Sequence, residues 1–131
     1  MMRRAAIYLA TLLLALAGGA VLSAAPAQAW SYCTGAPSAA GRLNLYAGQG
    51  YCGQWWSYRI PDNRPFCFEL YNFQGAENGV AAYWNRSEIT MRIHLLRGCE
   101  GSSKRILPNS SDPNLYDDGL YHNTSSILVL N

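Results

Sequence analysis

The sequence predicts an all-β domain in which one supersecondary unit occurs twice. Short alternating or aromatic runs, bounded by turn residues, recur about every 8–12 residues, which is typical of a β-sandwich or barrel. No segment keeps a helical i, i+3, i+4, i+7 apolar stripe over three turns. The second half also repeats landmarks of the first half in the same order. Four strands in each copy predict two Greek-key motifs packed as a sandwich, because each copy leaves an apolar face that the other must cover.

The repeat is visible as five matched landmarks that lie 44 to 48 residues apart. The matched pairs are Leu45-Tyr46 with Ile93-His94, Gly53 with Gly101, Ile60-Pro61 with Leu107-Pro108, Leu70-Tyr71 with Leu115-Tyr116, and Ala81-Ala82 with Ser125-Ser126. A period of this size indicates one structural unit used twice, and two copies are too few for a solenoid. We expect motif one over about residues 42–85 and motif two over about residues 90–131.

Each expected strand of the first copy begins and ends at an identifiable signal. Residues 42–46 alternate leucine with polar residues and stop at a glycine-rich turn. Residues 55–60 are aromatic and stop at the two-proline segment 61–65. Residues 66–70 alternate again, and residues 80–84 are small, apolar and aromatic. These four runs suit pleated, half-buried surfaces.

The second copy repeats the series with shorter runs. We expect strands over residues 90–95 and 104–107, a short piece near Leu115-Tyr116, and a last strand over residues 127–130. The last run is continuously apolar, which predicts a central strand and a chain that tolerates C-terminal truncation poorly.

Residues 1–29 predict a secretory signal peptide. Arg3 and Arg4 form a basic start, an apolar stretch covers residues 5–22, and Ala27-Gln28-Ala29 is a small-residue cleavage site. A membrane anchor is the alternative, but the leucine-rich part is short for a span and glycines follow it. We therefore expect a secreted, extracellular protein of one domain, residues 30–131, with no membrane segment in its mature form.

The charge balance argues against a nucleic-acid or lipid partner. The chain holds ten basic and eight acidic residues, and Arg3 and Arg4 are two of the ten, so residues 30–131 carry a formal charge of zero. A neutral chain without a basic cluster lacks the electrostatic footprint of nucleic-acid or anionic-membrane binding. We expect a monomer that binds neither.

Four cysteines in an exported chain indicate two disulfides. Three pairings are possible. We favour Cys33–Cys52, which would tie the N-terminal arm to the nearest hairpin, and Cys67–Cys99, which would join the two copies. A metal site is the alternative, but no C-x-x-C pair exists and the spacings are wide.

The second copy carries a family resemblance. Its sequence reads M-R-I-H-L-L-R-G-C-E-G, then a Pro/Asn/Ser loop, then N-L-Y-D-D-G-L-Y-H-N-T-S-S-I. This resembles the βγ-crystallin motif, with its turn glycine and its paired-serine corner before the last strand. Together with the signal peptide and the cysteines, residues 42–131 resemble the secreted peptidase inhibitor family typified by the metalloproteinase inhibitor of actinomycetes. The resemblance implies a βγ-crystallin-like fold and inhibition of an extracellular peptidase.

Two other functions fit the same scaffold. One is a βγ-crystallin-like structural or stress module with weak or no calcium binding. The other is a secreted antimicrobial protein. Calcium-binding members of the fold place two Asn or Asp residues before two free positions and a pair of hydroxyls, and each site mixes ligands from both copies. That pattern implies one composite calcium site from Glu77, Asn78 and Ser125, and we expect no other cofactor. The alternative is that Ser125 and Ser126 hydrogen-bond their own corner.

The proline segment after residue 60 is the candidate inhibitory loop. A pre-ordered loop lowers the entropy cost of binding, and here two prolines and a disulfide would stiffen it. Arg64, Phe66 and Cys67 could present side chains to a protease pocket, with Pro65 fixing the backbone. The alternative is an ordinary rigid connection. The equivalent loop, residues 107–114, is more polar and ranks second.

Catalysis finds little support in the sequence, and we expect no enzyme. Only His94 and His122 could act as near-neutral bases, and we interpret His94 as structural. Neither a G-x-S-x-G elbow nor an H-E-x-x-H motif occurs, and paired cysteines offer no thiol nucleophile.

Overall fold

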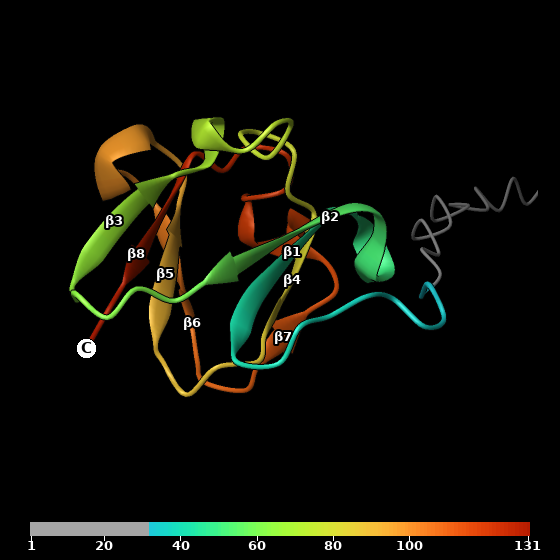
Figure 1. Ribbon diagram of the computed structural model, residues 1–131. Helices are drawn as coiled ribbons and strands as arrows, with labels where there is room; N and C mark the ends of the chain where they lie inside the picture. The colour runs from blue at the N-terminus through green and yellow to red at the C-terminus, as the bar shows by residue number, and fades with distance from the viewer. Residues whose placement is uncertain (1–31) are drawn as a thin grey trace, which may run out of the picture.

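The computed structural model describes residues 32–131, and these form two four-stranded antiparallel sheets packed face to face (Figure 1). Sheet A has the strand order β2-β1-β4-β7, and sheet B has the order β3-β8-β5-β6. The strands are β1 (Arg42–Gly48), β2 (Cys52–Arg59), β3 (Phe66–Glu69), β4 (Ala82–Asn85), β5 (Met91–His94), β6 (Ser103–Ile106), β7 (Ser111–Asp112) and β8 (Ser126–Val129). Short 3₁₀ helices join them: η1 (Gln49–Tyr51), η2 (Leu70–Asn72), η3 (Arg97–Cys99) and η4 (Leu115–Asp118). The expected signal peptide, residues 1–29, lies outside the described residues.

The two halves exchange their third strands. Strands β1, β2 and β4 of the first half form sheet A with β7 of the second half, while β5, β6 and β8 form sheet B with β3 of the first half. Each half therefore completes the sheet of the other. The predicted all-β sandwich of two Greek-key motifs is confirmed by this topology.

Equivalent positions in the two halves have the same backbone conformation. Gly50 and Gly98 share a left-handed backbone, with φ of 67° and 70° at the two hairpin turns. Asn78 and His122 also share it, with φ of 54° and 49°. The amide of Asn78 donates to the carbonyl of Thr124 at 2.8 Å, and the amide of His122 donates to Val80 at 2.9 Å. The two corners before β4 and β8 thus cross-link the halves in the same way.

The expected strand near Leu115-Tyr116 is wrong, because this segment is the 3₁₀ helix η4. The side chain of Asn114 accepts a hydrogen bond from the amide of Tyr116 and caps the helix, and Gly119 ends it with φ of 70°. The helical turn places Leu115 fully inside the core. The strand of this region is the two-residue β7, which lies just before it.

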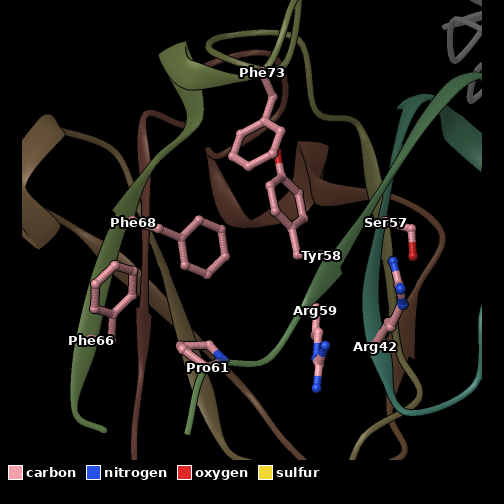
Figure 2. Close-up of a pocket in the computed structure, with 8 residues that line it drawn as sticks. All are labelled: Arg42, Ser57, Tyr58, Arg59, Pro61, Phe66, Phe68 and Phe73. Carbon is pink, nitrogen blue, oxygen red and sulfur yellow. The ribbon is translucent and has the colours of Figure 1, made fainter. Parts of the chain in front are cut away.

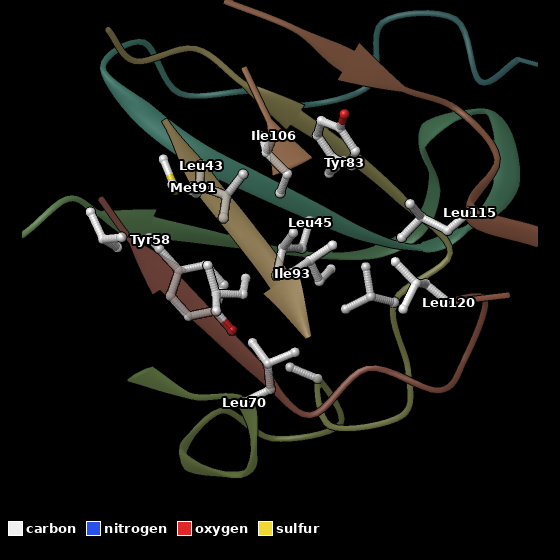
Figure 3. Close-up of a cluster of buried hydrophobic side chains, with 14 residues drawn as sticks. Leu43, Leu45, Tyr58, Leu70, Tyr83, Met91, Ile93, Ile106, Leu115 and Leu120 are labelled. Carbon is white, nitrogen blue, oxygen red and sulfur yellow. The ribbon is translucent and has the colours of Figure 1, made fainter. Parts of the chain in front are cut away.

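The core lies between the inner faces of the two sheets (Figure 3). Leu45 of β1 and Ile93 of β5, which occupy equivalent places in the two copies, are both fully buried. Ile127 and Val129 of β8 are also fully buried. Strand β8 pairs with β3 on one side and β5 on the other, so its predicted central position is confirmed.

The predicted disulfides Cys33–Cys52 and Cys67–Cys99 are both present. The first holds an N-terminal arm, residues 32–41, over the outer face of β1. There the hydroxyl of Tyr46 donates to the carbonyl of Pro37 at 2.7 Å, and burial raises the pKa of Tyr46 to about 12. The second joins β3 to η3 and so links the two halves.

Among residues 32–131, no helix has the length and apolar character needed to cross a membrane.

Candidate functional site

The corner before β8 brings together side chains from both halves. Glu77 lies on the loop between η2 and β4, and the nearby hydroxyl of Ser125 helps to lower the pKa of its carboxyl group. Asn78 is held beside them by the hydrogen bond of its amide to the carbonyl of Thr124. The three residues proposed as composite calcium ligands therefore surround one corner.

The carboxylate of this corner, that of Glu77, forms an ion pair with Arg97. Nε of Arg97 donates to Oε1 of Glu77 at 2.7 Å, and Nη2 donates to Oε2 at 2.8 Å. These bonds lower the pKa of Glu77, and the charge of Arg97 adds to the effect. The guanidinium also lies 4.8 Å from the ring centre of Tyr71. The side chain of Glu77 is 21% exposed and that of Arg97 is 63% exposed, so the carboxylate is partly buried while the guanidinium side of the pair faces solvent.

Sequence reasoning missed Arg97, which lies 20 residues from Glu77 in the turn of the second copy. The one available signal is that copy one has the uncharged Gln49 before its turn glycine, whereas copy two has Arg97 before Gly98. The replacement of an uncharged residue by an arginine points to an ion pair only when the structure shows that this turn lies beside Glu77.

The chemistry of the corner is that of an ion pair. Calcium takes six to eight oxygen ligands and favours several carboxylates. Of the three candidate ligands only Glu77 is a carboxylate, and a bidentate guanidinium uses both of its oxygens, while the neighbouring Glu69 accepts a hydrogen bond from the amide of Gly98 at 2.6 Å. Within residues 32–131 no cluster of three or more His, Cys, Asp or Glu side chains could hold a metal. Arg97 thus places beside Glu77 the positive charge that a bound cation would otherwise supply.

The equivalent corner before β4 is closed by different groups. Ala81 and Ala82 stand where copy two has Ser125 and Ser126. The Nε2 of His122 donates to the carbonyl of Ala47 at 2.8 Å, and its ring stacks on Tyr121 with centres 4.0 Å apart. A protein side chain therefore fills this corner too.

Ser126 holds the hairpin that carries Arg97. Its hydroxyl accepts from the amide of Cys99 at 2.9 Å and donates to the carbonyl of Leu96. The interpretation that the paired serines hydrogen-bond their own corner describes Ser126 well, whereas the hydroxyl of Ser125 lies near Glu77 of the other half.

His94, one of the two candidate bases, is a buried residue of β5. It is only 7% exposed, and neither ring nitrogen has a hydrogen-bond partner among the described residues. The arrangement offers a substrate no access to this imidazole.

The four residues of the candidate inhibitory loop are placed in three different ways. Arg64 and Pro65 are exposed on the connection between β2 and β3. Phe66 begins β3, and its ring faces a crevice between the two sheets rather than standing on the loop tip (Figure 2). Cys67 anchors the connection through its bond to Cys99.

The comparisons identify the fold. No family model matches the chain, and no curated protein matches it. Among solved structures, a domain from work on the evolution of the eye-lens βγ-crystallin fold shares 20% identity, with a TM-score of 0.60, over 76% of this chain and 93% of that one. The N-terminal domain of Protein S shares 14% identity, with a TM-score of 0.55, over 69% and 96%. A βγ-crystallin domain from Clostridium beijerinckii shares 15% identity, with a TM-score of 0.54, over 68% and 97%.

These similarities agree with the exchanged strands and the paired corners described above. At 14–20% sequence identity, these structural similarities establish the fold and do not establish an activity. Residues 32–131 therefore adopt the βγ-crystallin fold, as a sandwich of two interlocked Greek-key motifs with two disulfides.

Proposed function

We propose that this protein is an extracellular βγ-crystallin-like structural module, without catalytic activity, that keeps its fold without calcium. The ion pair between Arg97 and Glu77 carries the proposal, because it neutralises the carboxylate of the composite corner within the chain itself. Two disulfides support a protein built for an oxidising compartment, and a neutral domain supports one without nucleic-acid or membrane partners. We propose that it acts as a monomer.

The calcium response of thermal unfolding tests this proposal. We expect the melting temperature of the wild-type protein to be the same in millimolar calcium as in a chelator, because a ligand that does not bind the native state cannot stabilise it. Arg97→Ala frees both oxygens of Glu77, and we expect this variant alone to gain a small rise in melting temperature in millimolar calcium. Arg105→Ala, an exposed arginine of β6, is the matched control and should behave as the wild type. A wild-type melting temperature that climbs with calcium would refute the proposal.

Peptidase inhibition is the second candidate. The connection between β2 and β3 supports it, because Asp62, Asn63, Arg64 and Pro65 are all exposed and the neighbouring Cys67 is anchored by a disulfide. An exposed segment with fixed ends loses little entropy when a protease binds it.

Titration of secreted proteases separates the two functions. A structural module should leave a panel of metalloproteases and serine proteases fully active at excess protein. An inhibitor should abolish the activity of one of them at about one equivalent, and Arg64→Ala or Pro65→Ala should then weaken the inhibition. A double substitution in a different exposed turn, Glu100→Ala with Ser102→Ala, is the control for a nonspecific loop effect.

A further inference from the structure

The sandwich is open along the edge where β2 and β3 lie. These are the first strands of sheets A and B, and the connection over residues 60–65 runs between them. A crevice of about 380 Å³ opens here. This volume is at the small end of the range of about 300–1,000 Å³ that is common for ligand sites.

The walls of the crevice are largely aromatic. Tyr58 of β2, Phe68 of β3 and Phe73 after η2 surround a common space with Phe66 (Figure 2). Ring centres of Tyr58 and Phe73 are 4.3 Å apart, and those of Tyr58 and Phe68 are 4.8 Å apart. Phe66 and Phe73 remain 39% and 38% exposed. Large apolar side chains that stay partly open to solvent in a concave site are typical of ligand binding.

Two arginines stand on the rim of the crevice. Arg42 and Arg59 lie directly opposite each other in the β1–β2 pair, and both side chains are exposed. Within residues 32–131, the ion pairs use Arg97 and Lys104, and neither rim guanidinium has a partner. Like charges directly opposite on neighbouring strands repel each other. An anion bound between them would remove this repulsion and accept hydrogen bonds from both.

The equivalent edge of the second half carries charged side chains where the first half carries rings. In sheet B, Phe68 lies opposite Ile127, and in sheet A the equivalent position opposite Tyr83 is Asp112. Asp112 forms an ion pair with Lys104, which also pairs with Asp118. Burial alone would lower the pKa of Lys104, but the hydrogen bonds to the two carboxylates outweigh it and raise that pKa. The charges of the second edge are thus paired within the chain, while the first edge is aromatic with unpaired cations beside it.

We propose that the crevice between β2 and β3 binds a small amphipathic anion, an aromatic or aliphatic carboxylate. Its apolar part lies against Phe66, Phe68 and Phe73, and its carboxylate faces Arg42 and Arg59. The chemistry of the crevice matches one ring or a short chain that ends in an acid. This role goes beyond the structural function proposed above and does not depend on the calcium corner.

The test compares 3-phenylpropionate with 3-phenyl-1-propanol, a neutral molecule of similar size and shape. Each is titrated into the ¹⁵N-labelled protein and followed by amide chemical shifts. We expect saturable shifts around Tyr58, Phe66 and Phe73 for the acid, with a dissociation constant in the millimolar range for so small a ligand. The alcohol should bind the same site about threefold to tenfold more weakly, because it lacks the charge that the exposed arginines attract.

Two variants separate charge from apolar contact. Arg42→Gln with Arg59→Gln should remove the preference for the acid over the alcohol. The matched control is Arg92→Gln with Arg105→Gln, which removes the directly opposed arginine pair of β5 and β6, away from the crevice, and should keep that preference. Phe66→Ala should weaken both compounds, and since Phe66 is partly exposed at the edge, the variant should keep the wild-type spectrum elsewhere.

Three results would overturn the proposal: no saturable shift for the acid, equal binding of the acid and the alcohol, or the same loss of preference in both arginine double variants. None of these measurements involves calcium or a protease. A failure here is therefore distinguishable from a failure of the structural function.

Discussion

Deleting residues 126–131 is expected to abolish the cooperative fold. The deletion removes β8, which forms four residue pairs with β3 and four with β5, and it removes the fully buried Ile127 and Val129. Burial of two such side chains contributes roughly 3–6 kcal/mol, and the loss of both pairings leaves sheet B in two pieces. A domain of this size has a total stability of only about 5–15 kcal/mol. Near-ultraviolet circular dichroism and amide shift dispersion should both lose their native signals.

The matched control for this truncation is deletion of Asn131 alone. Asn131 is exposed and lies outside every strand, so the shortened chain should melt as the full chain does. A sharp thermal transition in the chain that lacks residues 126–131 would show that β8 is dispensable and that the described topology does not account for stability.

Substitution of the two equivalent core residues, Leu45→Ala and Ile93→Ala, is expected to destabilise the protein by similar amounts. Both side chains are fully buried, one on β1 and the other on β5. Removal of a buried leucine or isoleucine side chain usually lowers the free energy of unfolding by about 2–5 kcal/mol, because transfer and cavity costs add. Urea denaturation of the disulfide-intact protein measures the loss.

Leu107→Ala is the control for the core substitutions, because Leu107 is 52% exposed. We expect its effect to stay within about 0.5 kcal/mol, as for most surface changes. If one core variant cost several kcal/mol and the other almost nothing, the two halves would not share one interior equally.

Local patterns in the sequence predicted most of the strands. Alternation with period two and turn glycines act within a few residues, so the segments near β1, β2, β3 and β5 could be placed without any tertiary knowledge. The error at Leu115-Tyr116 has a local origin as well. An apolar pair beside a proline resembles a short strand, whereas the cap of Asn114 and the burial of Leu115 favour a 3₁₀ turn.

The candidate corner was predictable only in part. The resemblance to the βγ-crystallin motif predicts that Glu77 and Ser125 share one corner, because the repeat alignment carries that information, and their role as ligands stays a prediction. Arg97 was not predictable, because its ion pair with Glu77 requires the hairpin of one half to fold over the loop of the other. The same holds for the crevice, whose aromatic walls come from β2, β3 and the segment after η2.

By itself, the sequence determined the all-β class and the duplication, because each depends on residue type and spacing along the chain. It left three disulfide pairings open, and the structure selects the favoured one, Cys33–Cys52 with Cys67–Cys99. The tertiary structure alone decided that β3 and β7 change sheets, that Arg97 occupies the corner of Glu77, and that Arg42 and Arg59 stand unpaired beside an aromatic crevice. The physical reason is distance along the chain. Arg97 and Glu77 lie 20 residues apart and come from different halves, so they interact only after the two halves have closed over their common core.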